Sequence, residues 1–235
     1  MFKMHNFQSL STFIQRHQLR SYPSSKRILI LIATHADTPL RKLAIHQNLR
    51  FLRNLSSSIV IVNTKGTYNI SKEDKDLTYL EIENDIMYDF GKWTYGLKHT
   101  DLSPYDFILF VNDSIFINKD ISAFVHQGTK ESVELYGYTD NRDHIPHYQS
   151  YIFMIRIDAI PKFIHMVESK KSLIHGYHDL IRHYELVMRY YFSSHGGFLP
   201  ISTISPKNIY SPKMKSLYTL LRQHNVIPFT KLKQL

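Results

Sequence analysis

The sequence predicts an α/β protein: a single domain with a mostly parallel central sheet, flanked by helices in a Rossmann-like, doubly wound arrangement. Two continuous apolar runs, 28–32 and 107–111, have the length of a strand and lack alternation, as in parallel strands covered on both faces. Segments with helical apolar spacing lie between the strand candidates. Small polar residues follow the strand candidates, and ligands of open α/β sheets bind at that place.

The first unit is strand, helix, strand. Residues 27–33 and 57–62 are the two predicted strands, and residues 40–55 between them carry apolar side chains at helical spacing, with arginine and lysine on the other side. Successive parallel strands joined by a helix form a right-handed crossover. The pattern therefore favours a doubly wound sheet over a sandwich or a helix bundle.

The remaining elements continue this alternation. We expect a helix from about Phe90, capped by Asp89, and three later helices. The further strands are expected at 77–83, 105–112, 134–140, 147–157 and 198–204, and the later helices at 159–169, 177–192 and 213–224. We divide the chain into an N-terminal helix and linker, 1–26, and one α/β domain, 27–235.

Composition restricts the chemistry. The chain has no cysteine, which excludes disulfides, thiolate zinc sites and cysteine nucleophiles and suits a reducing compartment. No apolar run approaches the roughly 20 residues that span a bilayer. The net charge of +9 suggests anionic partners. We expect a cytoplasmic protein and leave open a peripheral membrane contact. The basic residues are scattered and form no nucleic-acid motif, so no nucleic-acid partner is expected.

Asp113 is the strongest single candidate for a functional residue. It follows the apolar strand 107–111, between Asn112 and Ser114. Mg²⁺ and Mn²⁺ prefer carboxylate, carbonyl, water and phosphate oxygens, so a carboxylate at a strand end can hold such an ion against a diphosphate. The alternative is that Asn112 and Asp113 only shape a turn.

Other strand ends supply candidate ligands for a nucleotide. Thr34 and His35 follow the first strand, and Asn63 follows the second. Asp89 and Lys92 lie at the start of a helix, where they could hold ribose and phosphate, or only cap and pack. The chain has neither the glycine fingerprint of dinucleotide-binding folds nor a P-loop, which argues against hydride transfer and P-loop ATP hydrolysis.

The second half of the chain supplies candidates for the reacting sugar. Alternation along a single strand would place His147 and Gln149 on one side, where they could bind sugar hydroxyls. Glu185 lies in an apolar helical stretch, and a carboxylate in such a setting suits a base near neutral pH. Asp140 competes with Glu185 for that role, and Glu185 could instead face water.

Several short segments, taken in order, carry a resemblance to a known family. They include Tyr88–Leu97, Tyr105–Ser114 and Gly137–Asp140, followed by His147–Tyr151, Tyr184-Glu185 and the closing Pro228–Lys231. In this order they resemble the rhamnan-synthesis F-type glycosyltransferases, and the likeness runs from about Arg27 onward. It implies a GT-A fold, similar to small viral and bacterial polysaccharide glycosyltransferases.

The resemblance also implies an activity. The donor would be a UDP-, GDP- or dTDP-sugar, the acceptor a glycan or lipid-linked glycan, and the cofactor Mn²⁺ or Mg²⁺. Asn112-Asp113-Ser114 stands where related enzymes carry an Asp-x-Asp motif, so two of the three positions depart from the pattern. The prediction is an inverting, metal-assisted transfer in polysaccharide synthesis. The alternative is a module of the same fold that binds nucleotide sugar or glycan without chemistry.

Overall fold

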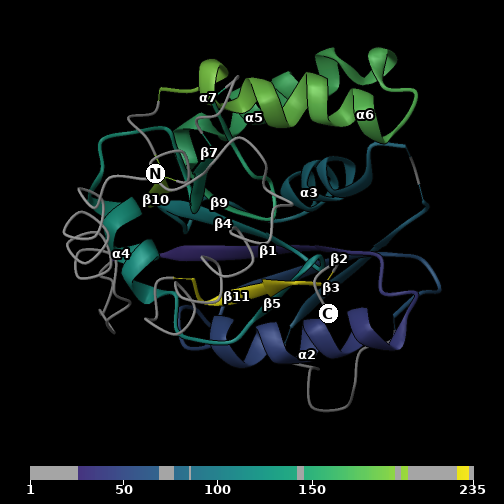
Figure 1. Cartoon of the computed structure of the whole chain (residues 1–235), viewed down its shortest axis with the longest axis horizontal. Coiled ribbons are helices and arrows are strands. Elements are labelled where there is room, and N and C mark those ends of the chain that lie inside the picture. The colour runs from purple at the N-terminus through teal and green to yellow at the C-terminus, as the bar shows by residue number, and fades with distance from the viewer. Residues whose placement is uncertain are drawn as a thin grey trace, which may run out of the picture.

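The computed structural model describes residues 26–68, 77–84, 86–141, 146–193, 197–200 and 227–232. They form three layers, with a central sheet between two layers of helices (Figure 1). The predicted α/β domain with a mostly parallel sheet and flanking helices is confirmed. The predicted N-terminal helix, the boundary at residue 26 and the helix at 213–224 lie outside or at the edge of the described residues, and they stay predictions.

The central sheet has the strand order β3-β2-β1-β4-β9-β6. Its strands β1, β2, β3 and β4 pair in parallel, while β9 pairs antiparallel with both β4 and β6. The bounds are Ile28–Thr34 for β1, Ile59–Thr64 for β2, Thr78–Ile82 for β3, Phe107–Asn112 for β4, Leu135–Gly137 for β6 and Ile152–Arg156 for β9. Every residue of β1, β2 and β4 is buried, which explains their unbroken apolar sequences.

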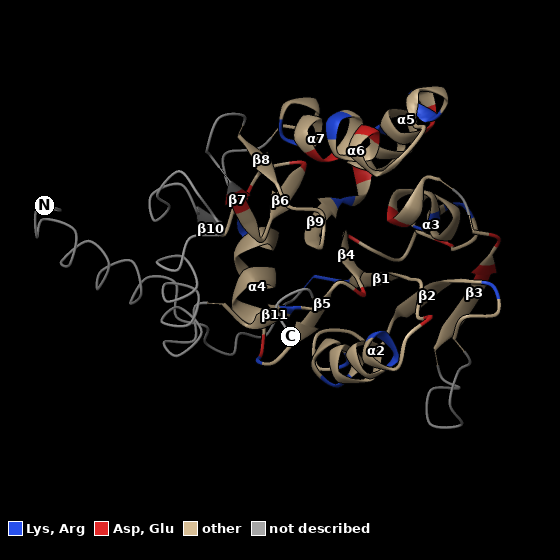
Figure 2. Cartoon of the chain, turned by 45° about the vertical axis from the view of Figure 1, so that its right-hand side comes forward, with Lys and Arg blue, Asp and Glu red and all other residues tan. Residues whose placement is uncertain are grey.

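The two faces of the sheet are covered by different helices. Helix α2 (Pro39–Leu52) lies on one face, and α3 (Tyr88–Lys98) and α5 (Ile160–Ser169) lie on the other (Figures 1 and 2). Trp93 of α3 packs edge-on against Phe110 and Phe153. A Cβ atom at Gly96 would lie 2.7 Å from the side chains of Leu31 and Val62, so glycine permits the close approach of α3 to the sheet.

Two small sheets extend the core. One has the order β10-β7-β8, and the other pairs β11 with β5. The bounds are Ile115–Ile117 for β5, Thr139–Asn141 for β7, His147–Tyr148 for β8, Leu199–Pro200 for β10 and Phe229–Lys231 for β11. The antiparallel pairing of β11 with β5 brings the end of the described chain beside the segment that follows β4.

The second half of the chain is more irregular than its sequence predicts. The expected strand 134–140 is divided into β6 and β7, and the expected strand 147–157 is divided into β8 and β9 by a turn. The expected helix 177–192 contains a π-helical segment, η4. The bounds are Tyr177–Leu180 for α6, Ile181–Glu185 for η4 and Leu186–Tyr191 for α7, with α4 at Ser122–Lys130, η2 at Ile157–Ala159 and η3 at Lys171–Leu173.

Two further findings concern expected features. Asp89 does not cap α3: the N-cap position is Met87, and its side chain makes no capping hydrogen bond. Among the described residues, no helix is both long enough and apolar enough to pass through a bilayer. The cytoplasmic location expected from the composition stays a prediction.

Candidate functional site

Asp113 lies where the strand order of the sheet reverses. From β1, the strands β2 and β3 follow on one side and β4 on the other. Ala33 of β1 is in register with Asn112 of β4, so Thr34 and Asp113 emerge side by side at the carboxyl ends of the two strands. This is the switch point at which open α/β sheets bind their ligands. Asp113 therefore lies at the end of a buried central strand, as the sequence predicts.

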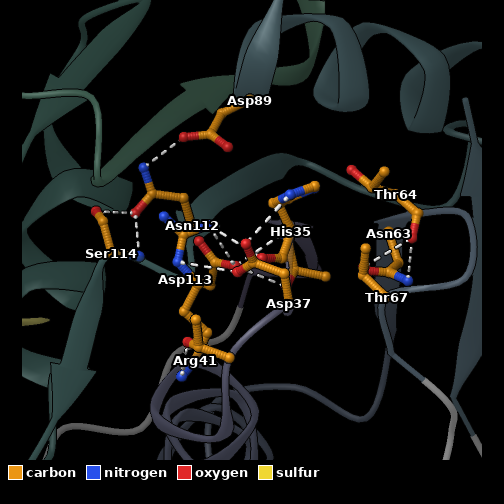
Figure 3. Close-up of polar contacts among 12 residues, drawn as sticks. His35, Asp37, Arg41, Asn63, Thr64, Thr67, Asp89, Asn112, Asp113 and Ser114 are labelled. Atoms are coloured by element: carbon orange, nitrogen blue, oxygen red, sulfur yellow. Dashed lines mark hydrogen bonds and ion pairs between the residues drawn. The ribbon is translucent and has the colours of Figure 1, made fainter. Parts of the chain in front are cut away.

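The carboxylate of Asp113 is held by the end of β1. Its Oδ2 atom accepts hydrogen bonds from Thr34 Oγ1 at 2.9 Å and from the His35 amide at 2.7 Å. Arg41 approaches the same oxygen at 3.9 Å and donates to the carbonyl of His35 at 3.0 Å (Figure 3). Thr34 is fully buried and the Asp113 side chain is 6% exposed. We call Thr34, His35, Asn112 and Asp113 the strand-end group.

Asn112 connects this group to helix α3. Its side-chain nitrogen donates to Asp89 Oδ2 at 2.8 Å, and its side-chain oxygen accepts from both the amide and the hydroxyl of Ser114 (Figure 3). Desolvation, followed by repulsion from the Asp113 carboxylate, raises the pKa of Asp89 to about 6. Asp89, predicted as a ribose ligand, thus faces the same site as Asp113.

The site offers carboxylate oxygens to a hard divalent cation such as Mg²⁺, but not a complete set of protein ligands. The contacts to Asp113 and Asp89 from described residues fall on Oδ2 of each, which leaves an Oδ1 atom on both carboxylates for a cation or a hydroxyl. Mg²⁺ typically takes one or two protein carboxylates and completes its shell with water and phosphate. Within the described ranges, no group of three or more His, Asp or Glu side chains is arranged to hold a metal.

The other predicted nucleotide ligands have mainly structural contacts. Asn63 is fully buried; its amide nitrogen donates to the Thr64 carbonyl at 2.7 Å and to the Tyr79 hydroxyl at 2.9 Å, and its oxygen accepts from Thr67. Asn63 therefore joins β2 to β3. Lys92 is buried beneath the start of α3, where its ammonium group lies 3.5 Å from the Tyr88 carbonyl.

The expected pairing of His147 with Gln149 along one strand is wrong. Strand β8 ends at Tyr148, and the turn that follows sends the two side chains to different partners. His147 Nε2 lies 4.0 Å from Glu185 Oε1, whereas the side-chain oxygen of Gln149 accepts from Lys231 Nζ at 2.7 Å. A period of two residues cannot reveal a turn that interrupts it.

Glu185 receives its strongest contact from a residue that the sequence did not single out. The Ser150 hydroxyl donates to Glu185 Oε2 at 2.6 Å. Glu185 is the last residue of η4, and its side chain is 19% exposed. We call His147, Ser150 and Glu185 the turn group. The signal for Ser150 is its place next to His147 and Gln149, although the sequence does not show its partner.

Asp140, the other candidate base, is placed differently. It is fully buried and forms an ion pair with Arg189 of α7. Its second carboxylate oxygen lies 3.4 Å from the amide of Gly197. Asp140 is also in register with Tyr148 of β8, whose ring lies under the Arg189 guanidinium at 5.7 Å. These contacts join β7, β8 and α7 into one unit.

The last described strand contributes a cation. Lys231 Nζ lies 4.7 Å from the centre of the Tyr151 ring and also donates a hydrogen bond to the side-chain oxygen of Gln149. Lys231 is in register with Ile115, and the amide of Leu232 donates to the Ser114 carbonyl at 3.0 Å. Lys231 belongs to the closing segment noted in the sequence, but its own role was not predicted.

The strand-end group and the turn group are neighbours. The amide of Asn112 donates to the carbonyl of Tyr151 at 3.2 Å, and Ser150 immediately precedes Tyr151. Tyr184, next to Glu185, packs on Phe90 of α3 with ring centres 4.9 Å apart. The described structure thus brings Asp89, Asp113 and Glu185 to one end of the sheet, each on a different element.

Comparison with known proteins finds a relative that matches part of this chain. No family model matches the chain. Virulence protein VirA of Vibrio anguillarum is 29% identical over 179 residues, which cover 68% of this chain and 53% of VirA. A second VirA sequence from the same species matches equally. The chain thus spans about half the length of the curated relatives it matches.

Solved structures with a similar course of the chain include three transferases. A candidate nucleotide-diphospho-sugar transferase from Desulfovibrio desulfuricans G20 is 10% identical, with a TM-score of 0.46 over 84% of this chain and 97% of that one. The inositol-1-phosphate CTP transferase from T. maritima is 10% identical, with a TM-score of 0.49 over 86% of this chain and 98% of that one. The galactosyltransferase LgtC is 9% identical, with a TM-score of 0.45 over 87% of this chain and 86% of that one. Since these TM-scores lie below 0.5, we draw the function from the geometry of the site.

Proposed function

We propose that this chain is a glycosyltransferase that moves a sugar from a nucleoside-diphosphate donor to a hydroxyl of a glycan acceptor. The observation that carries the proposal is the position of Asp113 at the switch point between β1 and β4, held by Thr34 and by the His35 amide. The resemblance of the ordered segments to rhamnan-synthesis glycosyltransferases supports the same reading and favours a role in polysaccharide synthesis.

The donor would bind across the strand-end group. Thr34 and His35 border the place for the nucleotide, and Asp89 is the candidate ligand for ribose hydroxyls. Arg41 and Lys231, which reach this region from α2 and β11, supply positive charge for the diphosphate. Asn63 and Lys92 would act through the backbone they support rather than by direct contact with the donor, since Asn63 donates to the Thr64 carbonyl and Lys92 lies against the Tyr88 carbonyl.

Mn²⁺ or Mg²⁺ is part of this proposal. The Oδ1 atom of Asp113 is the protein atom that would hold the cation, with water and donor phosphate oxygens completing its shell. When bound, the cation would neutralise charge on the departing nucleoside diphosphate. Asn112 orients the Asp89 carboxylate, because its side-chain nitrogen donates to Asp89 while its backbone nitrogen donates to the Tyr151 carbonyl.

Glu185 is the proposed base for the acceptor. It would take the proton of the acceptor hydroxyl as that oxygen forms a bond to the anomeric carbon, while the bond to the diphosphate oxygen breaks and its electron pair leaves with the nucleotide. An attack opposite the leaving group gives inversion. We prefer Glu185 to Asp140 because Glu185 is partly exposed, whereas Asp140 is fully buried and paired with Arg189.

The proposal is tested by donor binding and turnover. Purified protein is melted with UDP-, GDP- and dTDP-sugars, each with Mn²⁺ and with EDTA; a donor that binds only the folded state raises the melting temperature. The expected result is a shift with one donor class that is larger with Mn²⁺, together with sugar transfer or slow donor hydrolysis. No shift and no turnover with any donor would reject the proposal.

A second function has one observation in its favour. Asn112 and Ser114 replace the flanking acidic residues of an Asp-x-Asp motif, and their side chains bind each other and Asp89 instead of presenting free oxygens. The chain would then be a module that binds a nucleotide sugar or glycan without chemistry. Saturable donor binding without transfer or hydrolysis, with and without Mn²⁺, would favour this function.

A further inference from the structure

Ser150 makes a contact that the proposed function does not yet use. Its hydroxyl donates to Glu185 Oε2 at 2.6 Å, and its backbone amide lies 3.4 Å from the same oxygen. Hydrogen bonds to a carboxylate are shorter and stronger than those between neutral groups. A single residue thus holds one oxygen of Glu185 by two donors.

The turn that carries Ser150 is fixed at both ends. The amide of Gln149 donates to the Thr139 carbonyl at 3.3 Å, and the carbonyl of Tyr151 accepts from the Asn112 amide at 3.2 Å. The hydroxyl groups of Tyr151 and Thr139 are 2.8 Å apart and buried. Ser150 therefore has a defined position relative to Asn112 and the strand-end group.

The segment that carries Glu185 is equally constrained. It ends the π-helical stretch η4, and π-helical turns are rare and frequent at functional sites. The neighbouring Tyr184 is fully buried, and its hydroxyl donates to the Val167 carbonyl at 2.8 Å. A widened turn changes the direction of the side chains that follow it, so Glu185 faces Ser150 and His147 while Tyr184 stays in the core.

We propose that Ser150 is the positioning residue for Glu185, and that it acts by occupying Oε2 so that Oε1 is presented to the acceptor hydroxyl. This inference rests on the proposed glycosyltransferase function. The Nε2 atom of His147 lies 4.0 Å from Oε1, so an acceptor hydroxyl bound at Oε1 would also lie near His147. Without the serine hydroxyl, the carboxylate could rotate away from the direction of attack, and misorientation slows transfer without weakening donor binding.

The test compares four proteins after the donor has been identified: wild type, Ser150→Ala, Ser150→Thr and Ser122→Ala. Ser122 is a matched control, because its hydroxyl also donates to a carboxylate, Asp120, at 2.9 Å, but at the start of α4. For S150A we expect kcat to fall about 10- to 100-fold with an unchanged KM for the donor. S150T should recover most of the rate, and S122A should keep the wild-type rate.

A double-mutant cycle with Glu185→Gln separates positioning from general damage. If Ser150 acts through Glu185, then adding S150A to E185Q should lower the rate no further. Full additivity of the two changes, or a wild-type kcat in S150A, would overturn the inference. If S150A melts at a lower temperature than S122A, Ser150→Cys, with similar size and a weak donor, takes its place in the same cycle. A wild-type protein without turnover would reject the proposed function itself, and this inference with it.

Discussion

The strand-end group and the turn group lie side by side but are built in different ways. Asp113 is positioned by the register of two buried parallel strands and is bound by Thr34 and by a backbone amide. Glu185 is positioned by a short turn and a π-helical segment, and its close contact is a side-chain hydroxyl. The comparison indicates that the first group depends on the sheet as a whole, whereas the second depends on a few hydrogen bonds to a carboxylate, worth about 1.5–3 kcal/mol each.

The largest effect is expected at Asp113. In Asp113→Asn the side-chain oxygen can still accept from Thr34 and His35, so the strand-end group should keep its structure while losing its charge. We expect transfer to fall on the order of 10³-fold or more, with loss of the extra thermal shift from Mn²⁺. Initial rates and donor melting curves measure both. Turnover near the wild-type level would show that the sheet end is not the centre of the chemistry.

Glu185→Gln should separate chemistry from binding. The amide keeps the size of the side chain but cannot take a proton, so kcat should fall on the order of 10²-fold while the donor melting shift is unchanged. Steady-state kinetics in acceptor and donor give the two constants. A variant with wild-type kcat would remove the turn group from the reaction and reopen the role of Asp140.

Asp140→Asn should harm the fold instead. The change leaves Arg189 without its buried carboxylate, and breaking a buried ion pair costs about 3–5 kcal/mol. Denaturant unfolding measures the loss. The double variant Asp140→Leu with Arg189→Met removes both charges together and should recover most of the stability. If D140N is as stable as the wild type yet inactive, Asp140 rather than Glu185 is the base.

The sequence was sufficient for the strand-end group because unbroken apolar runs have few alternatives. The run before Asp113 is too apolar for an exposed strand and is followed by three small polar residues, so both its burial and its polar end could be predicted. The pairing of β1 with β4, which brings Thr34 to Asp113, follows from the usual order of doubly wound sheets.

The turn group could not be predicted to the same depth. We read residues 147–157 as one strand, although the consecutive polar residues Gln149 and Ser150 interrupt its alternation just where the turn at Ser150 and Tyr151 forms. The contact between Ser150 and Glu185 joins residues 35 positions apart, and Lys231 reaches Gln149 across 82 positions. Such contacts depend on tertiary packing that local periodicity does not encode.

Asp89, which joins α3 to the strand-end group, predicts a pH dependence of stability. Its pKa is about 6 in the folded protein against an ordinary 3.8, so the folded state binds the proton more tightly than the unfolded state. Stability contributed by this group is therefore lost as the pH rises from about 4 to 6. In EDTA, Asp89→Asn should be more stable than the wild type at pH 7 by about 3 kcal/mol, and nearly equal to it at pH 4 or below.

Urea unfolding at several pH values measures this difference. Asp101→Asn is a suitable control, because that exposed carboxylate has a lowered pKa from the Ser103 amide and should show the opposite trend. A D89N variant that is less stable than the wild type at pH 7 would contradict the repulsion between Asp89 and Asp113. The strand-end group would then depend on Asp89 for its structure.

The smallest expected effect concerns Lys231, which lies between the two groups. Its ammonium group contacts Gln149 in the turn, and its strand pairs with the segment that follows Asp113. Lys231→Met keeps most of the apolar stem over Tyr151 but removes the charge, so the KM for the donor should rise about tenfold, since a hydrogen bond to a charged group is worth about 1.5–3 kcal/mol. Gln149→Ala, which leaves the charge in place, should change this KM less. If the KM for the donor rises as much in Q149A as in K231M, or more, then Lys231 acts by ordering the turn and belongs with the turn group.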